Sequence, residues 1–218
     1  MQVLDIVNIV KAKLDELTPY NEALVISGVS YADQTINYIN QVLPEAVREI
    51  TMQAPTHLLP QSELKIIHQS ATSDNPNKFI IENAILTLIL PASFIKLAWL
   101  KLPGWASIVT ETITPEHPLY IKQTNKHTMG TPSRPIVVKH KDADGKLKLK
   151  CYSTGTTVIP VDAEISIGAY ISALAATDVP DILIDALTSL CAAKVLIIYG
   201  KIKEAELNLK QYQTQLAR

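Results

Sequence analysis

The chain has 218 residues, a hydrophobic fraction of 47% and a formal net charge of -1. A chain of this length builds one large domain or one domain with a sizeable insert, and its near-neutral charge excludes a global field that would attract nucleic acid, membranes or acidic substrates. Cys151 and Cys191 are too few for a disulfide framework and have no CxxC spacing, so we expect both to be buried free thiols.

The first quarter of the chain predicts helices. Residues 3–17 carry apolar side chains at spacings of four and three, which is typical of an amphipathic helix, and Thr18-Pro19 ends it. A second helix begins after Ser30, a favoured N-cap residue, and continues until Pro55. Pro44 lies inside this pattern, so we expect either a kink there or a new helix that starts with proline.

The middle of the chain changes to patterns typical of strands. We expect a loop at residues 55–77, strands within residues 78–90 that pair through a turn near Glu82-Asn83, and an extended run at residues 94–102. Pro103-Gly104 predicts a turn after this run. The proline-rich stretch at residues 110–135 then predicts a long ordered excursion of the kind found at binding surfaces.

The clearest local pattern is a β-hairpin. Residues 136–138 enter it, Asp144-Gly145 provides the turn, and apolar residues alternate with lysines on the way back. Residues 158–172 predict one or two further strands.

The last forty residues carry the strongest helical pattern. Asp178 provides a cap and Pro180 a first-turn proline at its start. The apolar stripe that follows changes at Gly200: before it little of the helix could face water, and after it only a narrow seam is apolar. The members of the stripe are Ile184, Leu187, Cys191, Val195, Ile198, Ile202, Ala205, Leu209, Tyr212 and Leu216.

The order of these elements predicts the fold class. Helices from both ends of the chain flank the β segment, so the two helical arms pack together and the β segment is an insert. We therefore expect an α+β fold, with a helical bundle formed by the N- and C-terminal helices and an inserted, mostly antiparallel β domain. The helical base is placed at residues 1–60 and 175–218, and the β-rich insert with its long loops at residues 61–174.

Targeting signals and chemical motifs are both missing from the sequence. The N-terminus has no signal-peptide pattern, and no apolar run approaches the ~18–20 residues that cross a bilayer, so we expect a protein made in the cytoplasm with no membrane partner. None of the seven glycines lies in a phosphate-binding frame, and the five histidines show no HExxH motif. Asp142, Asp144 and Gly145 lack the other ligands of a calcium loop. We therefore expect no catalytic residue, no cofactor and no metal site.

A group of lysines in the predicted hairpin is the main charged feature. Because alternate residues of a strand share a face, Lys146, Lys148 and Lys150 lie on one face, and together with Lys139 and Lys141 from the other strand they are candidates for a basic face that could follow a phosphate backbone. The favoured interpretation is a solvated outer face whose lysines also protect an exposed strand edge. That face has no aromatic residues for stacking on bases. The five are Lys139, Lys141, Lys146, Lys148 and Lys150.

Five short segments occur in an order that resembles one protein family. They are residues 43–48 (LPEAVR), 90–97 (LPASFIKL), 102–105 (LPGW), 130–135 (GTPSRP) and 180–187 (PDILIDAL). Together they resemble the head-to-tail connector proteins, the neck adaptor or ring proteins of tailed bacteriophages, especially those of crAss-like phages. The similarity extends from about Leu14 to Tyr212. The chain departs from the pattern at Lys96, where an arginine is expected, and at Lys201-Ile202, where a charged pair is expected.

The resemblance implies a virion structural protein without catalysis. Such proteins are helical bundles with a β insert, and they assemble as a ring, typically twelvefold, beneath the portal. The ring joins the capsid to the tail around a channel. The implied partners are other copies of the chain, the portal protein and other neck or tail proteins, while DNA passes through the channel without specific binding.

Neighbouring subunits of a ring contact each other through two unlike faces, so each subunit needs two contact surfaces. We expect one in the narrow seam after Gly200 and the other on the proline-rich excursion. The candidate residues are Leu209, Tyr212 and Leu216 in the seam, and Met129, Thr131, Pro132 and Arg134 in the excursion.

Two other classes of function are compatible with the sequence. One is a soluble α+β enzyme or ligand-binding domain whose site is assembled by folding, which a deep pocket with converging polar groups would reveal. The other is a nucleic-acid-binding module that uses the hairpin from Lys139 to Lys150, which a steep loss of affinity with salt would reveal.

Overall fold

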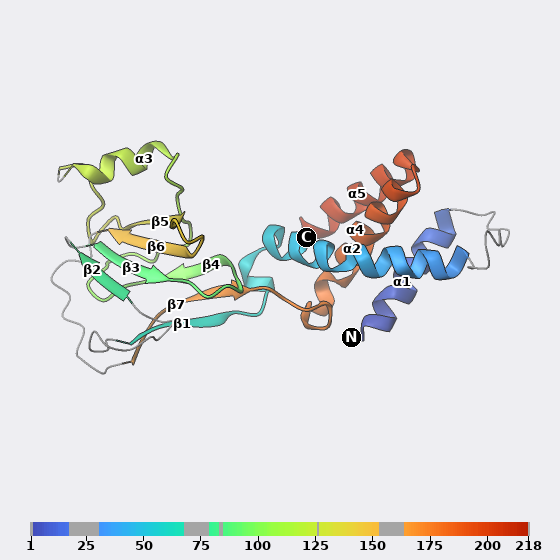
Figure 1. Cartoon of the computed structure of the whole chain (residues 1–218), viewed down its shortest axis with the longest axis horizontal. Coiled ribbons are helices and arrows are strands. Elements are labelled where there is room, and N and C mark those ends of the chain that lie inside the picture. Colours follow the sequence, from blue (N-terminus) through green and yellow to red (C-terminus); the bar gives the residue numbers. More distant parts are fainter. Residues whose placement is uncertain are drawn as a thin grey trace. The chain divides into compact units, whose positions relative to one another are not determined.

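The computed structural model describes residues 2–17, 31–67, 79–82, 85–125, 127–152 and 164–217. Of these residues, about 47% are helical and 24% lie in strands, and the strands form two antiparallel sheets (Figure 1). The predicted α+β class, with helices at both ends and a β insert between them, is confirmed.

The chain divides into two compact units. The helical unit comprises residues 1–60 and 173–218, and the β unit comprises residues 61–172. The second boundary thus lies two residues before the one that the sequence suggests, at the end of the last strand rather than in the segment that follows it.

The helical unit is organised around α4 (Ile184–Ile198). This helix contacts α1 (Val3–Leu17), α2 (Tyr31–Gln53) and α5 (Ile202–Leu216). Every residue at positions 186–193 is buried, as expected for the part of the apolar stripe that precedes Gly200. The interior of the unit therefore forms around a helix that is enclosed on most of its sides.

The α2 helix is continuous through Pro44. The alternative of a second helix that starts at this proline is therefore wrong. Ile39, Leu43, Val47 and Ile50 are all buried, so a single apolar face continues on both sides of the proline and holds the helix against its neighbours. The predicted N-cap at Ser30 lies outside the described residues.

The α4 helix begins later than predicted. Two short 3-10 turns, η3 (Ala176–Asp178) and η4 (Asp181–Leu183), precede it, and Leu183 occupies its N-cap position. Asp178 therefore does not cap the helix; its Oδ1 accepts a hydrogen bond from Thr177 Oγ1 at 3.2 Å. Pro180 starts η4 instead of α4.

Gly200 shapes the turn between α4 and α5. Its φ is +73°, a region that is costly for residues with a Cβ. The N–H of Lys201 donates to the C=O of Leu196 at 2.9 Å, and the N–H of Gly200 donates to the C=O of Ile197 at 3.0 Å. This pair of bonds is the Schellman motif, which satisfies the last carbonyls of a helix. The glycine therefore ends α4 and allows α5 to pack against it.

The β unit contains two antiparallel sheets in its described residues. The strand order is β1-β7-β4 in the first sheet and β2-β3-β6-β5 in the second, and neighbouring strands are hydrogen-bonded. The strands are β1 (Ser62–Ile67), β2 (Phe79–Glu82), β3 (Ile85–Ile89), β4 (Phe94–Leu100), β5 (Ile136–Lys141), β6 (Leu147–Tyr152) and β7 (Glu164–Ser172).

Apolar residues from both sheets form a single core. Leu64, Leu97 and Ile167 come from the first sheet, while Leu88 and Leu149 come from the second. Since alternate residues of a strand share a face, each sheet turns one apolar face toward the other. The sheets therefore pack face to face within this unit.

The strand predictions succeed except at β1. The predicted strands are confirmed at residues 79–82, 85–89, 94–100, 136–141, 147–152 and 164–172, whereas the predicted loop at residues 55–77 contains β1. Asn83 of the predicted turn and residues 158–163 of the last predicted strand segment lie outside the described residues. A short 3-10 turn, η1 (Thr56–Leu58), precedes this strand. β1 is held by pairing with β7, about a hundred residues away, and Leu64 is its buried contact with the core.

Candidate interaction surfaces

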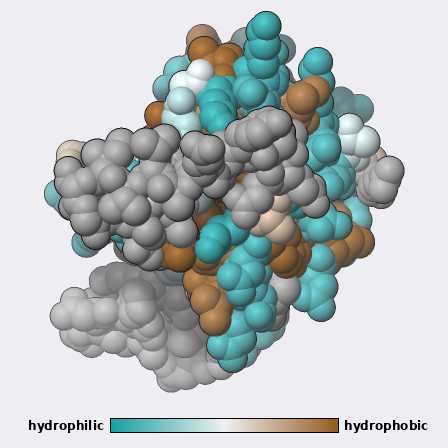
Figure 2. Space-filling model, turned by 90° about the vertical axis from the view of Figure 1, so that its right-hand side faces the viewer, coloured by the Kyte–Doolittle hydropathy of each residue, from teal (hydrophilic) through white to brown (hydrophobic). Residues whose placement is uncertain are grey.

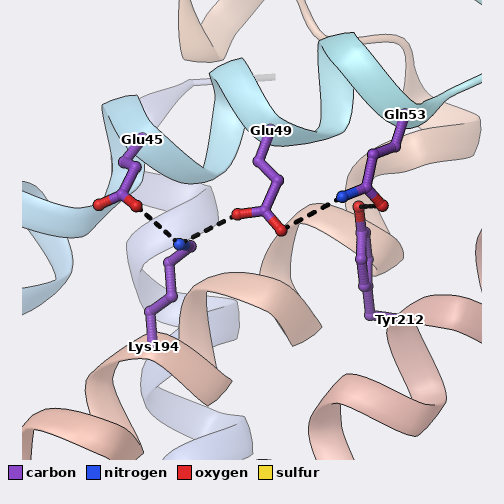
Figure 3. A network of polar contacts seen from close by, with 5 residues as sticks. All are labelled: Glu45, Glu49, Gln53, Lys194 and Tyr212. Carbon is purple, nitrogen blue, oxygen red and sulfur yellow. Dashed lines mark hydrogen bonds and ion pairs between the residues drawn. The ribbon is translucent and has the colours of Figure 1, made fainter.

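A polar network joins three helices of the helical unit (Figure 3). Lys194 of α4 donates from Nζ to Glu45 Oε1 at 2.9 Å and pairs with Glu49 Oε2 at 3.0 Å, both on α2. Gln53, also on α2, donates from Nε2 to Glu49 Oε1 at 3.4 Å and accepts from the hydroxyl of Tyr212 on α5 at 2.8 Å. These contacts link α4 and α5 to the same face of α2.

The contacts of this network shift the pKa values of two of its members, Lys194 and Tyr212. Burial lowers the pKa of Lys194, but its hydrogen bonds to Glu45 and Glu49 outweigh that effect and hold the pKa above its ordinary value. Burial, followed by the charge of Glu49, raises the pKa of Tyr212 to about 12. At neutral pH the Lys194 ammonium group therefore lies between the side chains of Glu45 and Glu49, beside the protonated phenol of Tyr212, an arrangement that connects helices.

Tyr212 lies inside the helical unit and not on a surface for partners, which corrects its predicted role. Its side chain is 3% exposed, and Ala205 and Asn208 are buried on the same side of α5. Leu209 and Leu216, the other two residues of the predicted seam, are half-buried beside these buried residues. The buried side of α5 therefore includes a polar residue, Asn208, which the pattern of apolar residues does not predict.

Exposed aliphatic side chains gather instead at the turn between α4 and α5. Ile197 is 53% exposed, Ile198 is 48% exposed, and Ile202 is 63% exposed. The predicted stripe assigned Ile198 and Ile202 to the buried side, which is wrong because α4 ends at Ile198 and the chain reverses before Ile202. Figure 2 shows a face of the helical unit on which hydrophobic and hydrophilic side chains alternate.

The proline-rich excursion of the β unit ends in a tight, exposed turn. The N–H of Arg134 donates to the C=O of Thr131 at 2.8 Å, and the N–H of Thr131 donates to the C=O of Arg134 at 3.2 Å. Thr131, Pro132 and Arg134 are exposed, and Met129 is half-buried. The C=O of Pro132 accepts from the N–H of Ala106 at 2.9 Å, which fixes the turn to the segment after Trp105.

A short helix and a buried amide brace the rest of this excursion. The helix α3 (Pro118–Ile121) leads into η2 (Lys122–Thr124), where Gln123 is buried. The Oε1 atom of Gln123 accepts from the N–H of Gly130 at 2.9 Å, and its Nε2 atom donates to the C=O of Leu119 at 2.7 Å. The excursion is therefore an ordered part of the unit that presents a fixed turn.

The hairpin formed by β5 and β6 folds as predicted around Gly145, whose φ is +77°. The N–H of Asp142 donates to the C=O of Lys146 at 3.0 Å, and Asp142 Oδ1 accepts from the N–H of Lys146 at 2.9 Å. The opposed residue pairs of the two strands are Val138 with Lys150, Lys139 with Leu149, His140 with Lys148, and Lys141 with Leu147.

This register distributes the lysines over two faces of the hairpin. Directly opposed residues of an antiparallel pair share a face, so Lys148 and Lys150 lie with His140, while Lys139 and Lys141 lie on the opposite face. The prediction of one basic face is therefore wrong for Lys139 and Lys141. Five residues lie between Lys141 and Leu147, the opposed pair nearest the turn. Because this number is odd, odd-numbered residues of β5 oppose odd-numbered residues of β6, so Lys139 and Lys141 share a face with the leucines of β6.

His140 lies among the charges of the hairpin. Burial lowers the pKa of His140, and the charges of Lys150 and Lys148 also lower it. Lys148 pairs with Asp142 at 2.8 Å. Within the described residues, His140 Nδ1 is buried without a hydrogen-bond partner. The imidazole is therefore neutral at neutral pH and lies beside two ammonium groups.

Among the described residues, no three His, Cys, Asp or Glu side chains come together in a way that could hold a metal ion. Across those residues no helix has both the length and the apolar character that crossing a membrane requires. No protein-family model matches the chain, and no curated protein matches it.

Proposed function

We propose that this protein is a structural subunit of a phage neck. Copies of the chain form a connector ring that joins the portal and capsid to the tail and leaves a channel for DNA. The support is the sequence resemblance to head-to-tail connector proteins, together with the architecture of a helical unit that carries a β insert. The subunit acts through its contacts and catalyses no reaction.

Of the five segments that carry the resemblance, residues 43–48 lie inside α2, and the others lie at turns or at the start of a helix. Residues 90–97 include the turn from β3 to β4, where the N–H of Phe94 donates to the C=O of Pro91 at 3.0 Å. Residues 102–105 form a turn in which Gly104 has a φ of +85°. Residues 180–187 contain η4 and the start of α4. These segments therefore define the framework of both units, which is the level at which the resemblance applies.

The observation that carries the proposal is the aliphatic surface at the turn between α4 and α5. The helical unit buries a core of its own, yet Ile197, Ile198 and Ile202 remain about half exposed or more. Burying apolar surface yields roughly 25 cal/mol per Å², and exposed apolar patches often mark contacts between proteins. A ring contact needs such a surface on one side of each subunit.

Replacing Ile202 with aspartate tests this role. An aspartate in the first turn of α5 is compatible with the helix dipole, so we expect the Ile202→Asp subunit to fold normally. Wild-type protein should form closed rings, alone or with the portal protein of the same phage, in negative-stain images and in mass photometry. Ile202→Asp should shift the population to monomers, because a buried carboxylate opposes the contact.

Gln211→Asp provides the matched control. It adds the same charge to an exposed position of α5 without removing an apolar side chain, so rings should form as in the wild type. A wild-type protein that stays monomeric in the presence of the portal protein contradicts the proposal. Rings of Ile202→Asp that form at the wild-type concentration would show that this surface is not the contact.

A further inference from the structure

The hairpin of β5 and β6 concentrates positive charge in a nearly neutral chain. Residues 139–150 contain five lysines and two aspartates, a net charge of +3 with His140 neutral, whereas the whole chain has a net charge of -1. The other residues together therefore carry a net charge of -4. The hairpin is thus a local basic feature that the overall composition conceals.

Most of this charge is not neutralised within the protein. Asp142 pairs with Lys148 at 2.8 Å. In the part of the chain that the structure describes, Lys139, Lys141, Lys146 and Lys150 form no ion pair. Lys141 and Lys146 are exposed on either side of the turn, and Lys139 and Lys150 are half-buried behind them.

Protection of a strand edge does not account for these lysines. β6, which contains Lys148 and Lys150, lies between β3 and β5 and is not an edge strand. The outer edge of β5 is also partly covered, because the N–H of Ile113 donates to the C=O of Val137 and the C=O of Ile113 accepts from the N–H of Lys139. The charges of Lys148 and Lys150 even act against protonation of His140. Such mutual repulsion is relieved when a polyanion binds.

We infer that the tip of this hairpin contacts the phosphate backbone of double-stranded DNA through Lys141 and Lys146, the two lysines exposed on either side of the turn, without reading the base sequence. Lysine ammonium groups act as point charges toward phosphate, and such contacts carry no sequence information. Tyr152, the aromatic residue of β6, is 6% exposed and is not available to stack on the bases of a single strand. The choice of duplex DNA among polyanions rests on the proposed function, in which DNA passes through the ring.

The salt dependence of DNA binding tests the inference. The full-length protein is titrated into a fluorescently labelled DNA duplex, and the affinity is measured by anisotropy between 50 and 200 mM salt. Each neutralised phosphate contributes a slope of about -0.9, so two contacts predict roughly a tenfold loss of affinity over this range. For the Lys141→Ala/Lys146→Ala double variant the affinity should be weaker and nearly independent of salt, because both contacts are removed.

Lys101→Ala/Lys122→Ala is the matched control. Both lysines are exposed in the same unit but lie outside the hairpin, so this variant loses the same charge and should keep the wild-type salt dependence. Equal effects of the two double variants would mean diffuse attraction and would overturn the inference. It would also be overturned by undetectable binding at 50 mM salt, or by displacement of the DNA by polyglutamate at equal charge concentration.

Mass photometry of the same samples separates this inference from the proposed function. Rings that form but do not bind the duplex overturn the DNA contact and leave the connector function intact. DNA binding that depends on the hairpin, in a protein that never forms rings with its portal protein, supports the DNA contact and contradicts the connector function.

Discussion

Tyr212 combines packing and polarity in one side chain. Its ring is buried between α5 and the rest of the helical unit, and its hydroxyl donates to Gln53 Oε1 at 2.8 Å. Tyr212→Phe keeps the ring and removes the hydrogen bond, so we expect a loss of about 1 kcal/mol in the free energy of unfolding at pH 8. Urea denaturation measures this loss.

Because the pKa of Tyr212 is raised, the effect of Tyr212→Phe on stability should depend on pH. The phenol ionises near ~10 in an unfolded chain, and its pKa in the folded protein is about 12. Between these values the folded state binds more protons, so the stability contribution is complete below about pH 10 and is lost as the pH rises toward 12. The stability difference between wild type and Tyr212→Phe should therefore narrow at pH 11.

A double-mutant cycle provides the control for this residue. In a Gln53→Met background the hydroxyl of Tyr212 has lost its acceptor, so Tyr212→Phe should cost much less than it does in the wild type. If the stability losses of the two single variants simply add in the double variant, the hydroxyl of Tyr212 stabilises the protein through a contact other than Gln53. A difference that stays constant from pH 8 to pH 11 would contradict the raised pKa.

At the level of elements, Gly200 in the turn between α4 and α5 shows how a backbone conformation alone affects stability. A Cβ added to Gly200 would have no atom within 4 Å, so the cost of Gly200→Ala comes from the positive φ and not from a clash. We expect a loss of about 1–2 kcal/mol in the free energy of unfolding. Gly200→Asn should cost less, because asparagine tolerates this conformation at the end of a helix.

Thermal or urea unfolding of the two variants checks this order. Equal losses for alanine and asparagine would indicate a steric cause that the structure does not contain. Because this turn also carries Ile197, Ile198 and Ile202, a change in its backbone should weaken ring assembly as well.

At the level of the whole molecule, the two units differ in how the chain builds them. The β unit is one continuous segment with a core made of its own residues. We therefore expect a fragment of residues 61–172 to fold alone and to unfold cooperatively in urea. The fragment 1–60 should not fold alone, because it lacks α4, which the other helices of its unit contact.

Circular dichroism of the two fragments provides the measurement. A fragment 61–172 without a cooperative transition would show that the β unit depends on the helices. A stable helical fold in the fragment 1–60 would show that α4 is not the centre of the helical unit.

Short-range patterns were sufficient for most of the secondary structure and for the fold class. The spacing of apolar residues predicted α1 at residues 3–17, and Gly104, Gly145 and Gly200 marked three turns where φ is positive. These features depend on dihedral preferences and on periodicity, which a residue and its sequence neighbours determine. The helix–strand–helix order then predicted the inserted β domain, because two flanking helical arms must bury their apolar faces together.

The surfaces were decided by the tertiary structure. Whether Lys139 shares a face with Lys150 depends on the number of residues between the paired strands, and whether Tyr212 or Ile202 faces solvent depends on where α4 ends and how α5 packs against it. β1 likewise owes its conformation to β7, far away in the chain. Apart from β1, the sequence alone determined most of the helical, extended and turned segments, whereas the direction of each side chain required the partner elements, since burial is a property of the packed unit and not of the isolated segment.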